Sequence, residues 1–99
     1  MATLIHPETL TVTPSSGTIA ANTQHLLGIC YNILVKPATE TTTYDIKITN
    51  NKGIDIFEIL SETGTMSNSV SLPVHSIYTV TLSNATVDEE FIIQLIIQE

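Results

Sequence analysis

The chain has 99 residues, of which 42% are hydrophobic and 13% charged, a composition typical of one small globular domain and not of a disordered segment. Three lysines stand against ten acidic residues, which gives a net charge of −7. A surface that binds nucleic acid or an anionic membrane needs clustered cations, and so few lysines cannot supply one.

Short β-strands are predicted along the whole chain, because β-branched residues are frequent and favour the pleated surface of a sheet. The first strand is expected at residues 9–13, where apolar residues alternate with threonine, and residues 14–17 then form a turn. A second strand is expected at residues 26–36. Pro37 ends it, since proline lacks the N–H donor that a strand ladder needs.

The middle of the chain contains a hairpin signal. Apolar and polar residues alternate over residues 44–49, as in a strand with one buried face. Residues 50–53, with the sequence NNKG, tolerate positive φ and predict a tight turn into a strand at residues 54–60. A loop rich in serine, threonine and glycine is expected next, followed by a short strand at residues 70–72 that Pro73 stops.

The last two strands are expected at residues 77–82 and 91–97. Seven or eight short strands, spaced about ten residues apart, predict an all-β fold. This fold is a single small antiparallel β-sandwich over residues 1–99, jelly-roll-like or Ig-like, with a partly closed barrel as the alternative. All three tyrosines, including Tyr31, fall at positions predicted to face the core. The predicted core comprises Tyr44, Ile46, Ile48, Tyr78, Val80, Leu82, Phe91, Ile93 and Leu95.

The sequence contains no recognisable arrangement of catalytic or ligand-binding residues. The three histidines are far apart, and neither a nucleophile elbow nor a glycine-rich phosphate loop is present. Cys30 is the only cysteine, so no internal disulfide forms, and we expect it in the core. We therefore expect a protein that is not an enzyme and has no catalytic residue, metal ion or cofactor. A calcium site built from Asn84 and residues 88–90 is the alternative.

Several motifs resemble a pattern in small proteins of tailed bacteriophages. In that pattern a strand ends at KPAT, a turn rich in threonine and serine leads to TTYD, and the next strand begins. In this chain the two motifs are residues 36–39 and 42–45. The motifs LPV, YTV and NATVDE, at residues 72–74, 78–80 and 84–89, also match. The resemblance covers residues 31–99, and its second half is also similar to jelly-roll-like domains appended to secreted peptidases.

The phage resemblance implies a virion structural protein that decorates the capsid, or alternatively a tail or adhesion component. It implies no catalytic residues. The implied partners are a capsid or other virion protein and further copies of the chain, as a homo-oligomer. Such a protein is made in the bacterial cytoplasm, which agrees with the single cysteine and with residues 1–10, which lack the features of a signal peptide. The likeness to peptidase domains implies instead a small module that binds carbohydrate or calcium.

The final predicted strand offers apolar side chains to both of its faces. Its odd-numbered residues share the face that fills the core, whereas Ile92, Gln94 and Ile96 share the other face. A solvated face would carry threonine or charge, so this face is predicted to contact another chain, either a second copy or a capsid subunit. Glu89 and Glu90 lie beside it and are expected to limit which partners dock. The alternative is that loops cover both isoleucines.

Overall fold

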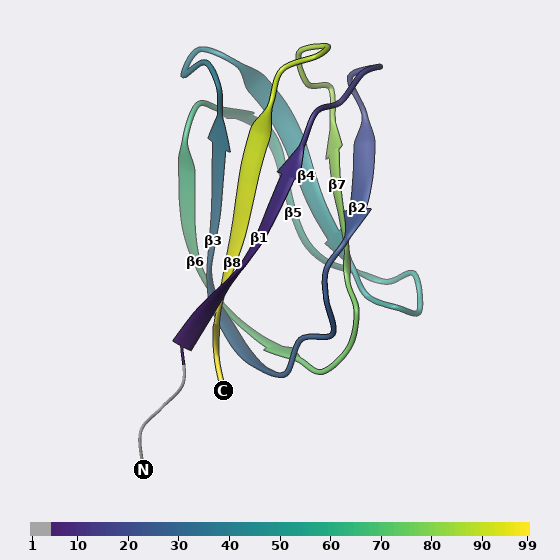
Figure 1. Ribbon diagram of the computed structural model, residues 1–99, viewed down its shortest axis with the longest axis vertical. Coiled ribbons are helices and arrows are strands. Elements are labelled where there is room, and N and C mark those ends of the chain that lie inside the picture. The colour runs from purple at the N-terminus through teal and green to yellow at the C-terminus, as the bar shows by residue number, and fades with distance from the viewer. Residues whose placement is uncertain (1–4) are drawn as a thin grey trace.

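The computed structural model describes residues 5–99 and contains, within that range, eight β-strands and no helix, hence none that crosses a membrane (Figure 1). The strands are β1 (Ile5–Val12), β2 (Ile19–Asn22), β3 (Gly28–Pro37), β4 (Thr43–Thr49), β5 (Asp55–Thr63), β6 (Met66–Val74), β7 (Thr79–Ser83) and β8 (Phe91–Gln98). Residues 1–4 of the predicted domain, which also begin the segment predicted not to be a signal peptide, lie outside the described residues.

The strands form two four-stranded antiparallel sheets, in the orders β1-β8-β3-β6 and β2-β7-β4-β5. The pairs β1–β8, β2–β7, β3–β6 and β4–β5 are those that one long hairpin, folded at the β4–β5 turn, would make. Rolling up that hairpin places β3 beside β8 and β4 beside β7, which is a jelly-roll arrangement. The predicted β-sandwich is confirmed, and its strand order is that of a jelly roll and not of an Ig-like domain.

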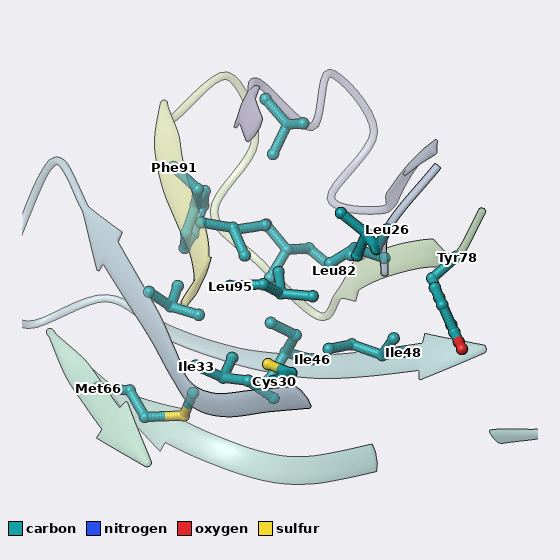
Figure 2. Close-up of a cluster of buried hydrophobic side chains, with 14 of the residues drawn as sticks. Leu26, Cys30, Ile33, Ile46, Ile48, Met66, Tyr78, Leu82, Phe91 and Leu95 are labelled. Carbon is teal, nitrogen blue, oxygen red and sulfur yellow. The ribbon is translucent and has the colours of Figure 1, made fainter. Parts of the chain in front are cut away.

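The core lies between the two sheets and is filled by alternate residues of their strands (Figure 2). All nine predicted core residues are buried there, which confirms the assignment of faces in the fourth, seventh and eighth strands. The rings of Tyr44 and Phe91 meet edge to face, with their centroids 5.4 Å apart. The Tyr44 hydroxyl donates a hydrogen bond of 2.7 Å to the carbonyl oxygen of Gly64, so its polar end is satisfied inside the core.

Several strand boundaries differ from the prediction. Residues 19–22 form β2, a strand too short for its alternation to be recognised. β6 begins at Met66, so the predicted serine, threonine and glycine loop shortens to a turn between β5 and β6. Pro73 does not stop β6, because β6 lies at the edge of its sheet and needs hydrogen-bond donors on one side only.

A bulge in β3 changes which of its side chains face the core. Cys30 lies opposite Ile97 of β8, and Asn32 lies opposite Ile96, so Tyr31 is an extra residue without a partner in β8. Cys30 is fully buried, as predicted, whereas Tyr31 is 37% exposed. The prediction that Tyr31 faces the core is therefore wrong, because strict alternation does not continue through the bulge.

Replacing Ile93 with alanine is expected to lower the free energy of unfolding by about 2–5 kcal/mol, the usual cost of emptying a core site. Ile93 is 1% exposed, within β8. Ile92→Ala is the matched control: it changes the same residue type, one position earlier, on the outward face, and should cost less than about 1 kcal/mol. Urea unfolding of both variants measures the difference, and equal losses would contradict the assignment of faces.

Candidate functional site

The outward side chains of the sheet β1-β8-β3-β6 form a surface that we call the β8 face. Its residues are Ile5, Pro7, Thr9 and Thr11 of β1, Ile92, Gln94, Ile96 and Gln98 of β8, Ile29, Tyr31, Asn32, Leu34 and Lys36 of β3, and Ser67, Ser69, Ser71 and Pro73 of β6. Ile5, Ile29 and Ile92 are 54%, 42% and 37% exposed. Large apolar side chains are therefore spread across the β8 face.

The three predicted contact residues of β8 lie together in the middle of this face. Ile92 lies between Thr11 and Lys36, Gln94 between Thr9 and Leu34, and Ile96 between Pro7 and Asn32. The side chain of Gln94 donates a hydrogen bond of 3.2 Å to the hydroxyl of Thr9. Ile92 is exposed, and Ile96 is half-buried beneath its neighbours. The loops do not cover Ile92, so the structure leaves this position open to a partner.

Charge is distributed unequally between the two outer faces of the sandwich. Lys36 is the one charged residue of the β8 face, which has no carboxylate. The outward side of the other sheet carries Asp45, Lys47, Asp55 and Glu58, and Lys47 lies 4.0 Å from Asp55. Since the whole chain has a net charge of −7, the β8 face is the side on which an approaching partner meets the fewest negative groups.

Glu89 and Glu90 lie in the loop between β7 and β8, at one end of the β8 face. The carboxylate of Glu89 accepts hydrogen bonds from the hydroxyl of Thr42, at 2.7 and 2.8 Å, and from the backbone N–H of Thr39, at 3.0 Å. Its side chain thus joins the β7–β8 loop to the β3–β4 loop. Glu90 is exposed, and its carbonyl oxygen accepts a hydrogen bond from Ala38. Of the two acids, Glu90 has the freer side chain.

Two further carboxylates, Glu40 of the β3–β4 loop and Asp45 of β4, accept hydrogen bonds at the same end of the sandwich. Glu40 accepts hydrogen bonds from the backbone N–H and the hydroxyl of Thr65, at 2.8 and 2.6 Å. Asp45 accepts hydrogen bonds from the backbone N–H of Ser61, at 2.7 Å, and from the side-chain amide of Asn84, at 2.6 Å. These bonds favour the charged form and hold the pKa of both carboxyls below its ordinary value. Acidic residues here have a structural role.

The structure does not bring together a set of metal-binding side chains in residues 5–99. Within that range, no three histidine, cysteine, aspartate or glutamate side chains are placed to hold a metal ion. Asn84, a residue of the alternative calcium site, donates its side-chain amide to Asp45. The described part of the chain also forms no pocket. The candidate site in these residues is therefore the β8 face and not a pocket.

Sequence reasoning missed part of the β8 face. Tyr31 joins it through the β3 bulge, and Pro73 joins it because β6 is longer than predicted. One signal was present: Cys30 and Ile33 are both apolar and three positions apart, a spacing that a regular strand cannot direct to one face.

The chain matches no protein-family model, and a search of curated protein sequences finds none that is similar.

Stability should fall in acid because of the carboxylates at the loop end. The pKa of Glu40 and of Asp45 is lowered by folding, so their stabilising effect is complete above the ordinary carboxyl pKa of about 4 and is lost as the pH falls through the lowered values. The double variant Glu40→Gln, Asp45→Asn should lose less free energy of unfolding between pH 6 and pH 2 than the unmodified chain. Urea titrations across this range measure the slope.

Glu58→Gln is the control for this acid effect, because it removes an exposed carboxylate of β5. It should change the pH dependence of stability less than the double variant does. An equal pH dependence in the double variant and the unmodified chain would show that the loop hydrogen bonds of Glu40 and Asp45 contribute nothing.

Proposed function

We propose that this chain is a non-enzymatic structural protein of a bacteriophage virion, and that it decorates the capsid by binding a capsid protein through the β8 face. The observation that carries the proposal is the pair Ile92 and Ile96, which lie in the middle of a face without carboxylates on a chain of net charge −7. The resemblance of residues 31–99 to small proteins of tailed phages supports the virion role.

Burial of the β8 face would supply the binding free energy. Burying a fully exposed isoleucine contributes roughly 1.5–3 kcal/mol. Ile92 is 37% exposed, so about a third of this remains available, and half-buried Ile96 can contribute less. Threonine and glutamine side chains around them can exchange water for hydrogen bonds to a partner. The complementary surface would be largely apolar. The carboxylates elsewhere on the chain would repel acidic surfaces and so disfavour other docking orientations.

The proposed setting is the virion, after synthesis in the cytoplasm of the host bacterium. Mass spectrometry of purified particles, with counts of copies per particle, tests this setting. Hundreds of copies per virion are expected for a capsid decoration protein. A dozen copies or fewer would indicate the alternative of a tail or adhesion component, and absence from the particles would overturn the virion role.

The double variant Ile92→Thr, Ile96→Thr should fold normally but fail to bind particles. Threonine keeps the β-branched shape that suits a strand and removes the apolar surface. The matched control is Ile54→Thr, Leu60→Thr, which removes two exposed apolar residues that lie outside the β8 face. Co-sedimentation with particles lacking the protein measures binding, and circular dichroism measures folding. Normal binding by the first variant, or its unfolding, would contradict the proposed role of these residues.

A second candidate function is favoured by one observation, the exposed ring of Tyr31. An aromatic ring on a surface can stack on a sugar, and Asn32 beside it on the same face could supply hydrogen bonds. The β8 face would then bind a glycan. A glycan array with the unmodified chain and with Tyr31→Ala tests this. Binding that disappears with Tyr31→Ala would support a glycan-binding function. An array without any bound glycan would contradict that function, and the capsid proposal would stand.

A further inference from the structure

Three of the four edge strands in the described sandwich carry features that hinder the addition of another strand. β1 contains Pro7, which lacks a hydrogen-bond donor, and β2 is only four residues long. β5 carries Asp55, Glu58 and Glu62 and has two irregularities in its pairing with β4. Charges, proline, bulges and shortness are the common means by which proteins prevent pairing at sheet edges.

β6 has fewer such features than the other three edges, with one irregularity in its pairing with β3. It is nine residues long and contains no charged residue, and its one proline, Pro73, lies next to its end. β3 is its only strand partner in the described part of the chain, so one side of its backbone is left for pairing. Ser67, Ser69 and Ser71 occupy its outward positions. A long, uncharged edge strand of this kind is a template for pairing with another strand.

The apolar interior between the two sheets is also incompletely covered at the side where β5 and β6 are the edge strands. Val70 and Leu72 of β6 are only half-buried against the core. The same is true of Ile56, Phe57 and Ile59 in β5, the strand that a tight turn connects to β6. A strand added beyond β6 would extend the sheet and cover part of this apolar surface.

We propose that β6 pairs antiparallel with β6 of a second copy of this chain, about a twofold axis, to form one continuous eight-stranded sheet from the two copies. The sequence of β6 is complementary to itself in this arrangement. Paired residues in an antiparallel sheet share a face, and the register with Ser69 opposite Ser69 also places Ser67 opposite Ser71. In this register the inward residues Val70 and Leu72 lie opposite Asn68 and Met66 of the other copy.

Charge favours this edge over the other long edges for contact between two copies. Two molecules of net charge −7 repel, and β6 is the long edge strand without a charged side chain, since β1 carries Glu8 and β5 carries three carboxylates. The carboxylates of β5 in the two copies approach each other near the axis, so added salt should tighten the association. The pairing would form whether or not the protein belongs to a virion, since Ile92 and Ile96 lie on β8, two strands away.

Sedimentation equilibrium of the full chain over micromolar concentrations tests the pairing. The unmodified protein should sediment with twice the 10.8 kDa mass of one chain. Ser69→Lys places an added charge from each copy at the pairing edge and should weaken the dimer by about tenfold or more, while the exposed position lets the monomer fold. Thr11→Lys is the matched control, because it adds the same charge to an exposed outward position of β1, the opposite edge of the same sheet.

Three outcomes would overturn the proposal: a monomer at all concentrations, a dimer that persists in Ser69→Lys, or a dimer that Thr11→Lys alone dissociates, which would indicate contact through the β8 face. Should Ser69→Lys fail to fold by circular dichroism, amide hydrogen exchange of the unmodified chain decides. Protection of alternate amides in β6, those that point away from β3, that increases with protein concentration supports the pairing, and protection independent of concentration overturns it.

Discussion

The pairing of β8 with two strands at once is the constraint on which the rest of the structure depends. β8 joins β1 on one side and β3 on the other, so none of its backbone is left at an edge. One of its faces fills the core with Phe91, Ile93, Leu95 and Ile97. The other can only face outward from the middle of the sheet, which is why apolar residues on that side become the centre of a surface instead of its margin.

The acidic residues complement this arrangement because several of them form hydrogen bonds at one end of the sandwich, away from the middle of the β8 face. Glu40, Asp45 and Glu89 accept hydrogen bonds from other loops and strands and so hold one end of the sandwich together. Such bonds to a charged acceptor are stronger than those between neutral groups. The chain therefore combines high net charge, which favours solubility, with one face that bears no carboxylate.

Sequence reasoning succeeded where alternation is regular and local. Residues 44–49 and 77–82 alternate strictly, and their buried sides are as predicted. The turn at Asn50 and Gly53 follows from residues that tolerate positive φ, and Gly53 has a φ of 80°. The bulge at Tyr31 was not predictable from alternation, because an extra residue in β3 is defined only by its pairing with a distant strand.

The parts of the candidate site that were missed have the same physical origin. Ile92, Gln94 and Ile96 share a face because they are neighbours in one strand, which a period of two reveals. The bonds of Glu89 to Thr39 and Thr42 connect segments about fifty positions apart, and no local pattern encodes them. The choice between jelly-roll and Ig-like order likewise depends on which distant strands pair, as does the tolerance of Pro73 in an edge strand.

The place of β1 in the sheet has a consequence for how the chain is made. In the described residues β1 pairs only with β8, and Thr9 and Gln94, which lie opposite each other, are 85 positions apart. During synthesis β1 therefore has no sheet partner until residues 91–98 have left the ribosome. At about 5–20 residues per second, this interval lasts several seconds. Such non-local pairing also makes folding slow. Pro7 lowers the tendency of β1 to aggregate while it is still unpaired.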